Sequence, residues 1–290
     1  MITFSTAKLT ATFAGTIGLT VLVKATAPNL NTFEIMFFRS LIGLVIVLQI
    51  GFLTGSLSQI KTNRLRLHLL RNIAHFTGQN LWFLAVAFIP FSQLFALEFS
   101  TPIWVALMAP FFLGEALTPR RLLAVGLGFL GVLIVARPDI DNLNPAILAA
   151  IGCAVCFSGS LIATKKLTKD QSITCILFWL TVMQLLMGGI AVLITGGITI
   201  PQGVDFLWVA AVGIGGLTAH FCITKALSLA PAIVVLPLDF LRLPLITLIG
   251  FLAYGEAFEW PIAVGALFII TAVFVNLQAE HARNRLGSGV

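Results

Sequence analysis

The stretch 91–115, FSQLFALEFSTPIWVALMAPFFLGE, decides the fold of this chain. It is apolar enough to cross a bilayer, yet it contains the acid Glu98. A carboxylate in hydrocarbon costs about 2.5–3.5 kcal/mol even on insertion-based scales, so an intramembrane acid indicates a functional site. The pattern recurs over 227–256, where Asp239 stands in the place of Glu98.

The recurrence keeps one fixed offset. The acids give 239 − 98 = 141, and the two Gly-Glu ends, at Glu115 and Glu256, give 256 − 115 = 141. The same offset relates further identical pairs: Gly18 with Gly159, Lys24 with Lys165, Phe37 with Phe178, Ala85 with Ala226, and Pro90 with Pro231. The sequence therefore predicts a duplicated unit, with a first repeat over 1–138, a second over 142–279 and a tail over 280–290.

The composition indicates an integral membrane protein. Of 290 residues, 59% are hydrophobic and only 10% are charged, with a mean hydropathy of +1.05. A soluble domain averages about 25% charged residues. Each apolar segment is close to the roughly 20 residues that a spanning helix needs. The predicted segments are 9–27, 33–53, 70–89, 92–112, 120–136, 145–164, 172–196, 206–227, 233–253 and 260–278.

We therefore predict an all-α membrane protein of ten transmembrane helices. Each repeat holds five, and because five is odd the second repeat is inserted upside down. Inverted repeats that meet around a central cavity are typical of secondary transporters. Small residues at matching positions of the fifth and tenth segments predict closely packed helices, namely Ala124 with Gly265 and Gly131 with Ala272.

The cations predict the orientation. With a cytoplasmic N-terminus, Lys24 and Arg137 fall outside, while thirteen Lys and Arg fall inside, among them Arg71 and Arg121. This asymmetry predicts a multi-pass protein of the inner membrane with both termini cytoplasmic. It also explains the pI near 9.5 without a nucleic-acid partner. We expect the first segment not to be a cleaved signal peptide, because no A-x-A-like site follows it.

Enzyme signatures are missing from the sequence. It contains no G-x-x-x-x-G-K-[ST], H-E-x-x-H or G-x-S-x-G motif, so we predict neither an enzyme nor a cofactor. Cys153 and Cys156 form a C-x-x-C without a second ligand pair, which favours packing over a metal site. Transport by this chain would then be driven by a gradient.

The informative residues are polar side chains inside the predicted spans. We predict that substrate is bound by Glu98, His75, Gln79, Asn80, Trp82, Thr101, His220 and Thr224. We predict gating or charge pairing for Arg39, Asp239, Arg242, Glu115 and Glu256. The four formal charges inside spans, on Arg39, Glu98, Asp239 and Arg242, sum to zero, as a low-dielectric interior requires.

Asp239 and Arg242 are three residues apart and are expected to form an ion pair. The structural alternative is that the buried charges pair only with one another and with backbone groups freed by prolines. On the same reasoning Glu115 is expected to pair locally with Arg120 and Arg121. Lys165 ends its span and is expected to reach the membrane interface.

The chain resembles the EamA-type branch of the drug/metabolite transporter superfamily. The resemblance rests on FEIMFFRSLIG around Arg39, QNLWFLAVAFIP, ALEFSTPIWVALMAPFFLGE and LLAVGLGFLGVLIVARP, and it covers nearly the whole chain. It implies a ten-helix inverted repeat with a cavity lined mainly by spans 1, 3, 4, 6, 8 and 9. It also implies metabolite transport, which in this superfamily includes amino-acid export and S-adenosylmethionine import. The phosphate carriers of the superfamily place several Lys and Arg in the cavity, a pattern that this sequence lacks.

The leading hypothesis is export of small zwitterionic or amphipathic metabolites, amino acids or their relatives, by alternating access. One alternative is uptake of a cationic metabolite such as S-adenosylmethionine, with Glu98 facing the sulfonium. A different class is a membrane scaffold or receptor that transports nothing. The expected partners are a small-molecule metabolite, the lipid bilayer and a proton as coupling ion, in a monomer or homodimer.

Overall fold

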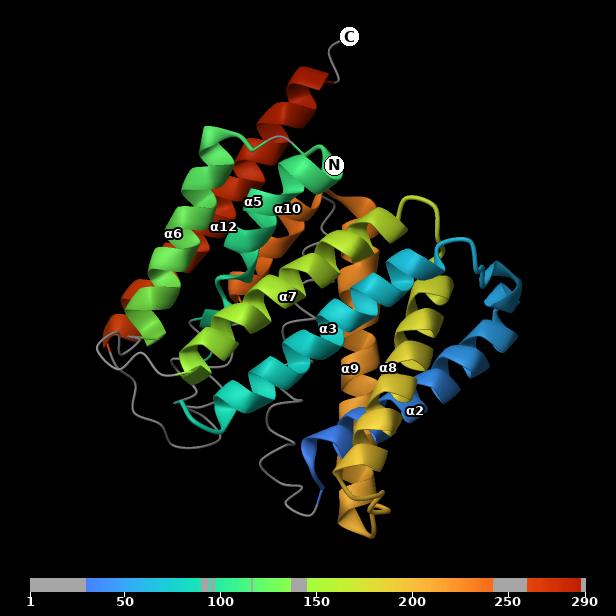
Figure 1. The fold of residues 1–290 in the computed structure, drawn as a ribbon. Helices are drawn as coiled ribbons and strands as arrows, with labels where there is room; N and C mark the ends of the chain where they lie inside the picture. The colour runs from blue at the N-terminus through green and yellow to red at the C-terminus, as the bar shows by residue number, and fades with distance from the viewer. Residues whose placement is uncertain are drawn as a thin grey trace.

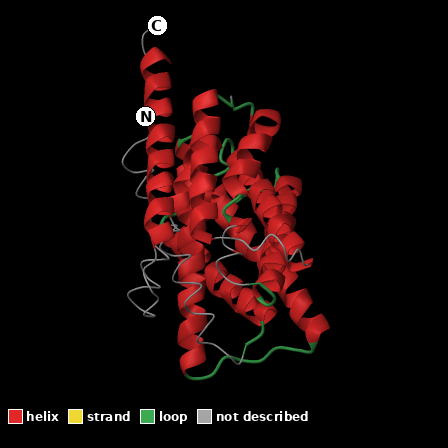
Figure 2. Cartoon of the chain, turned by 90° about the vertical axis from the view of Figure 1, so that its left-hand side faces the viewer, coloured by secondary structure: helices red, strands yellow, loops and turns green. Residues whose placement is uncertain are grey.

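The structure is a computed structural model that describes residues 30–89, 94, 97–115, 117–136, 145–241 and 260–287. Helices joined by short connections make up this part of the chain, which contains no strand (Figures 1 and 2). The elements are α2 (Thr32–Leu53), η1 (Ser56–Gln59), α3 (Leu65–Val86), α5 (Thr101–Leu113), α6 (Pro119–Ala136), α7 (Pro145–Leu167), α8 (Ile173–Thr195), α9 (Val204–Leu229), α10 (Ala232–Val235), η2 (Leu236–Leu241) and α12 (Trp260–Gly287).

Four of these helices, α2, α7, α8 and α9, are long and apolar enough to cross a membrane. Two shorter apolar helices cover Thr101–Leu113 and Ala263–Asn276. Most of the described helices begin and end close to the predicted segments, but α5 begins only at Thr101 and α12 continues past residue 278 to Gly287. The count of ten stays a prediction, because segment 9–27 and most of segment 233–253 lie outside the described residues.

Helices α2 and α8, which are equivalent under the offset, run antiparallel. The Glu34 carboxylate, in the first turn of α2, accepts a hydrogen bond from the Thr199 backbone N–H, just beyond α8. At the other end, the Ser56 and Thr174 hydroxyls are 3.2 Å apart, which joins η1 to the first turn of α8. The start of each helix therefore meets the end of the other, as an inverted repeat predicts.

The two helices also begin in the same way. The Asn31 side chain accepts from the Glu34 N–H and caps α2, while the Ser172 side chain accepts from the Cys175 N–H and caps α8. These capping residues are again 172 − 31 = 141 positions apart. A side-chain oxygen at the N-cap satisfies a backbone donor that has no partner within the helix. The duplication is therefore kept at the level of individual hydrogen bonds.

Helices α6 and α12 lie side by side, as Figure 1 shows. A Cβ atom added at Gly131 would lie 2.7 Å from the Gly265 carbonyl oxygen, so the two backbones are in close contact. Ala124 and Ala272 are fully buried along the same helix pair. The small residues thus allow close approach of neighbouring backbones, as predicted, and the structure shows that the neighbours are the fifth and tenth segments.

Both intramembrane acids lie where a helix is interrupted. Segment 92–112 is not one continuous helix in the structure, because Phe99 and Ser100 form a turn and α5 begins only at Thr101. In the second repeat, α10 gives way to the 3-10 stretch η2, which contains Asp239. Pro102 and Pro237 lack the backbone N–H that a continuous α-helix would need at these points. Discontinuous helices of this kind are common at transporter binding sites.

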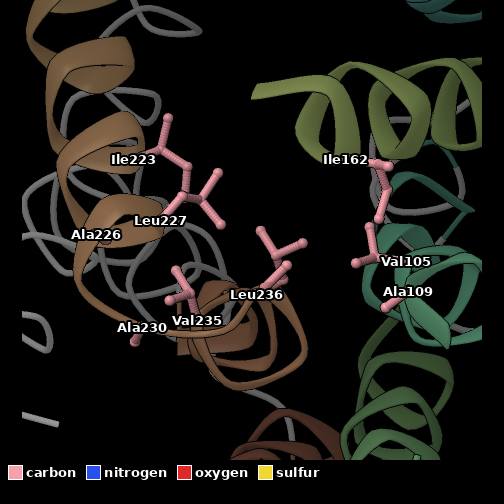
Figure 3. Close-up of a cluster of buried hydrophobic side chains, with 10 residues drawn as sticks. Val105, Ala109, Ile162, Ile223, Ala226, Leu227, Ala230, Val235 and Leu236 are labelled. Atoms are coloured by element: carbon pink, nitrogen blue, oxygen red, sulfur yellow. The ribbon is translucent and has the colours of Figure 1, made fainter. Parts of the chain in front are cut away.

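A buried apolar cluster holds the interrupted segments against the rest of the bundle. It joins α5, α7, α9, α10 and η2, and Figure 3 shows it as sticks. Val105 and Ala109 belong to the first repeat, whereas Ile223 and Leu227 belong to the second. The two repeats thus share one core beside the break in α10.

Candidate functional site

The site is organised around Arg39, which projects from the middle of α2. Its two terminal guanidinium nitrogens lie 3.0 and 2.7 Å from the side-chain oxygen of Gln79, with the amide oriented so that this oxygen faces the arginine. In that orientation the Gln79 amide nitrogen donates to Gln184 Oε1 at 3.2 Å. Three helices, α2, α3 and α8, therefore meet through one chain of hydrogen bonds.

The chain of hydrogen bonds continues along α3. Gln184 Nε2 donates to the Asn72 backbone oxygen at 3.0 Å, and Asn72 Nδ2 donates to the His68 backbone oxygen at 2.8 Å. Gln184 and Asn72 are buried, and a buried amide without partners would be costly. The connected amides therefore fix the side chains that surround Arg39.

Arg71 is a second buried cation that the sequence analysis assigned to the cytoplasmic loops. Its side chain is 2% exposed, its Nε donates to Thr164 Oγ1 on α7 at 3.0 Å, and Nη1 lies 3.5 Å from Asn72 Oδ1. A signal for it was present, because Arg71, His75 and Gln79 follow one another at steps of four and share a helix face.

Glycines on α9 leave room for the side chains of α2, including that of Arg39. A Cβ atom at Gly216 would lie 3.2 Å from Arg39 Cδ, and one at Gly213 would lie 2.8 Å from an Ile42 methyl group. Arg39 and His220 line a small pocket of about 20 Å³ between α2, α8 and α9. Its other walls are Ser40, Gly43, Leu180, Thr181, Gln184, Gly213, Gly216 and Leu217.

His75 and His220 come together across the two repeats. Their ring centroids are 4.8 Å apart and the rings are nearly perpendicular. The Phe157 ring of α7 lies 5.4 Å from His75 on centroids. The sequence singled out both histidines separately, and the structure places them in one pair beside the pocket.

Glu98 lies at the interruption before α5 and is held by two other predicted residues. Trp82 Nε1 donates to Glu98 Oε2 at 2.7 Å, and Thr101 Oγ1 donates to the Glu98 backbone oxygen at 2.6 Å. Glu98 is 8% exposed, so the Trp82 indole N–H provides a hydrogen-bond donor to a largely buried carboxyl group. A carboxylate next to an indole ring can recognise a cationic group.

Asn80 and Thr224 are positioned differently from these residues. Asn80 Nδ2 donates to the Phe76 backbone oxygen of its own helix at 2.7 Å. The Thr224 hydroxyl is buried and has no hydrogen-bond partner among the described residues. Arg242 and Glu256 lie outside the described residues, so the predicted Asp239–Arg242 pair stays a prediction.

Glu115 does more than pair locally, which corrects the expectation from the sequence. Its two carboxylate oxygens accept the backbone N–H groups of Ala232 at 2.9 Å and Ile233 at 3.0 Å, the first residues of α10. A carboxylate at this position satisfies donors that a helix N-terminus leaves unpaired and favours its positive dipole end. A residue of the first repeat therefore caps a helix of the second.

Lys165 holds the other side of the same connection. Its Nζ donates to the backbone oxygens of Leu227 at 2.6 Å and Ala230 at 2.7 Å, where α9 ends. We call this arrangement the Glu115–Lys165 clamp. Lys165 binds the carbonyl end of α9 and Glu115 binds the amide end of α10, so the turn between them is fixed from both sides.

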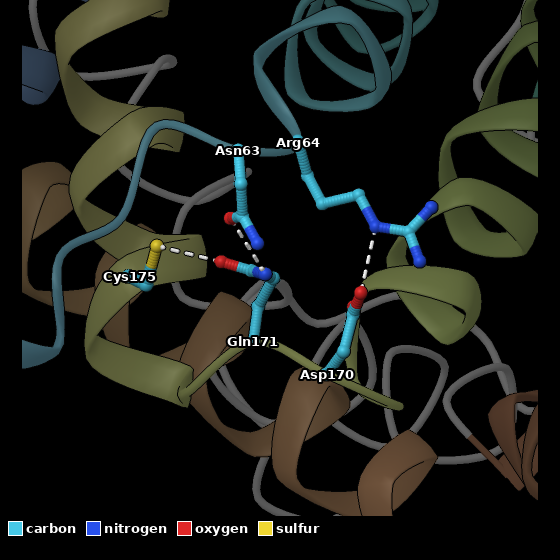
Figure 4. A network of polar contacts seen from close by, with 5 residues as sticks. All are labelled: Asn63, Arg64, Asp170, Gln171 and Cys175. Carbon is cyan, nitrogen blue, oxygen red and sulfur yellow. Dashed lines mark hydrogen bonds and ion pairs between the residues drawn. The ribbon is translucent and has the colours of Figure 1, made fainter.

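A further polar network joins the repeats near one end of the bundle (Figure 4). Arg64 Nε donates to Asp170 Oδ2 at 2.6 Å, and Gln171 Nε2 donates to Asn63 Oδ1 at 3.2 Å. Cys175 Sγ donates to Gln171 Oε1 at 3.3 Å. The ion pair is exposed, so it contributes little stability by itself. The network ties the loop before α3 to the connection between α7 and α8.

The similar proteins include transporters named for two different substrates. The chain is 26% identical over 260 residues to the S-adenosylmethionine uptake transporter of Rickettsia felis, covering 90% of this chain and 87% of the relative. It is 30% identical over 269 residues to the riboflavin transporter of Brucella anthropi, covering 90% and 93%. It is 32% identical over 219 residues to the riboflavin transporter of Rhizobium johnstonii, covering 75% and 72%.

The fold is also shared with a solved structure. A crystal structure that is 19% identical superposes with a TM-score of 0.80 and covers 97% of this chain and 98% of that chain. The EamA-like transporter family matches the chain twice, over residues 4–137 and 144–278, which are the two units that the offset of 141 relates. The chain is therefore a transporter of the multi-pass membrane class, and it belongs to the EamA-like transporter family.

Proposed function

We propose that the protein imports a carboxylate-bearing metabolite with a heteroaromatic part, and that S-adenosylmethionine is the first candidate. The observation that carries the proposal is two arginines without an acidic partner in the described part of the chain: Arg39, which lines the pocket, and Arg71, which is buried on α3. Among the described residues, Arg39 is hydrogen-bonded to Gln79, and Arg71 to Thr164 and Asn72, which are all neutral.

A guanidinium group without an acidic partner is costly to enclose. Residues 1–29 contain no Asp or Glu, so this segment cannot supply an acidic partner. A substrate carboxylate is well suited to fill this role, because it can accept two parallel hydrogen bonds from one guanidinium. Arg39 lines the pocket and has donors beyond those that Gln79 uses, so we assign the carboxylate to Arg39.

The Glu98–Trp82 pair supplies the opposite charge. S-adenosylmethionine carries a sulfonium and an ammonium besides its carboxylate, and a carboxylate beside an indole ring favours such cations. The relative from Rickettsia felis bears the name of this substrate and the direction of uptake. Amino-acid export was the leading hypothesis from the sequence. The relatives described above are named for other substrates, so we propose import in its place.

Riboflavin is the second candidate. The two riboflavin transporters share a higher identity with this chain than the Rickettsia protein does. Riboflavin is neutral, and its ring carbonyls can accept hydrogen bonds from Arg39 and from the amides around it. It offers no cationic group to the Glu98–Trp82 pair, which places it second.

Uptake into proteoliposomes tests the proposal. Purified protein is reconstituted, and exchange of radiolabelled S-adenosylmethionine and of riboflavin is measured in parallel, with empty liposomes as control. Saturable S-adenosylmethionine exchange supports the first candidate. Exchange of riboflavin alone would replace it with the second, and exchange of an amino acid alone would restore the hypothesis from the sequence.

Replacing Glu98 by Gln is expected to lower S-adenosylmethionine uptake by about tenfold, which corresponds to about 1.4 kcal/mol. The amide keeps an oxygen for the Trp82 indole, so the fold should persist. Counterflow at equal pH on the two sides separates two roles, because it fails if Glu98 binds substrate and survives if Glu98 binds the driving proton. Unchanged rates in both assays would make Glu98 a structural residue.

We propose that the Glu115–Lys165 clamp holds one gate of an alternating-access cycle. The clamp joins the repeats where α10 begins, next to the interrupted helix that carries Asp239. Glu115→Gln keeps the size of the side chain but leaves one acceptor oxygen for two N–H groups. Loss of a helix cap costs about 1–2 kcal/mol, so we expect uptake to change by about 5- to 30-fold. Arg120→Gln is the control, and an equal effect from it would contradict the assignment.

The orientation is part of the proposal. The positive-inside asymmetry places both termini in the cytoplasm and the chain in the inner membrane. A C-terminal alkaline phosphatase fusion, which is active only outside the cytoplasm, should therefore be silent, while a C-terminal fluorescent protein should be bright. The opposite result would reverse the orientation and move the Glu115–Lys165 clamp to the outer side.

A further inference from the structure

The histidine pair has a feature that substrate contact does not explain. His75 Nε2 is enclosed and has no hydrogen-bond partner within the described part of the chain. A buried nitrogen without a partner is costly, by about 1–3 kcal/mol. His220 of the second repeat faces it with ring centroids 4.8 Å apart. Two adjacent imidazoles, one with an unused nitrogen, form an arrangement that can accept a proton.

We propose that His75 and His220 form a proton site whose occupation is coupled to binding of the substrate carboxylate. The inference rests on the proposed function, because it takes the carboxylate to bind at Arg39. The proton enters from water and binds an imidazole nitrogen. No bond of the substrate breaks, and the proton is released to water on the other side of the membrane.

The coupling follows from the charges around the pair. The charged groups that act on the two imidazoles in the described part of the chain are Arg39 from α2 and Arg71 from α3. Helices α7 and α8 present the neutral side chains Phe157 and Gln184 to this region.

A proton on either imidazole adds a third positive charge to this poorly solvated region, whereas a carboxylate at Arg39 cancels one. Charges a few ångströms apart interact strongly where water is excluded. The bound carboxylate therefore favours the bound proton. By linkage the proton favours the carboxylate to the same extent. A carrier that moves only when both or neither is bound performs proton-coupled uptake.

Proteoliposomes loaded with a pH indicator test this inference, with S-adenosylmethionine as the probe. With the outside acidic, the wild-type protein should accumulate the probe at least tenfold above the level without a gradient and acidify the interior. His75→Gln and His220→Gln should abolish this accumulation, while the purified variants still bind the probe at equal pH on both sides. His68→Gln is the matched control, because His68 is a buried histidine of α3 outside the pair.

The outcomes separate this inference from the proposed function. Wild-type counterflow together with accumulation that ignores the pH gradient would overturn the proton site and leave the proposed function standing. Gradient-driven accumulation that survives in both histidine variants would overturn it as well. A wild-type protein that neither binds nor exchanges the probe would contradict the proposed function. It would also contradict the proposed coupling, which depends on that function.

Discussion

Arg39→Met is expected to abolish most uptake of a carboxylate substrate while the protein still folds and inserts. The variant removes the guanidinium group that lines the pocket and keeps a side chain of similar length. Hydrogen bonds to a charged group contribute about 1.5–3 kcal/mol each, so the substrate should bind about 10- to 150-fold more weakly. Binding and initial uptake rates of labelled S-adenosylmethionine measure the loss.

Arg64→Met is the matched control for this variant. Arg64 is an exposed cation whose only described ion pair is with Asp170, so its loss should leave uptake within about twofold of the wild type. Arg39→Lys separates charge from geometry, since an ammonium cannot make the planar two-bond contact. Wild-type binding by Arg39→Met would show that the carboxylate binds elsewhere and would end the assignment of Arg39.

The repeat architecture could be predicted because it depends on a pattern of the sequence itself, the fixed offset between equivalent residues. A duplicated sequence places Asn31 and Ser172 at equivalent positions, and each caps its own helix. Because each repeat has an odd number of predicted spans, the sequence also predicted the antiparallel arrangement that α2 and α8 show. Helix spacing also identified the polar face of α3, from which His75 and Gln79 reach the site.

Other parts of the site depend on contacts between distant segments, which no local spacing reveals. Arg71 lies one turn from the end of a span, where cations are usually cytoplasmic, and only the folded α7 provides Thr164 to receive it. Glu115 had basic neighbours in sequence, but in space the free N–H groups of α10 are its partners. Both misassignments arose because a charge near the end of a span has several possible roles.

The contact between α6 and α12 connects sequence, packing and stability in one place. Lipid is as apolar as leucine, so helices in a membrane associate through close packing and not through the hydrophobic effect. Gly131 allows that packing, because its missing side chain leaves room for the Gly265 carbonyl group. A backbone oxygen cannot rotate away as a side chain can, so added volume there must move a whole helix.

Gly131→Ala is therefore expected to destabilise the folded protein by about 1–3 kcal/mol, the usual cost of overpacking. The new Cβ would lie 2.7 Å from the Gly265 oxygen, 2.9 Å from Ile269 Cγ1 and 3.0 Å from Phe268 Cβ. Gly126→Ala, five residues earlier on the same helix, is the matched control, because a Cβ there meets no atom within 4 Å. Thermal unfolding in detergent is monitored by size-exclusion chromatography. The midpoint temperature should be lower for Gly131→Ala than for the wild type, and unchanged or higher for Gly126→Ala. Equal midpoints would mean that α6 and α12 can separate without loss, and that the small residues shared by the two repeats do not hold this helix pair together.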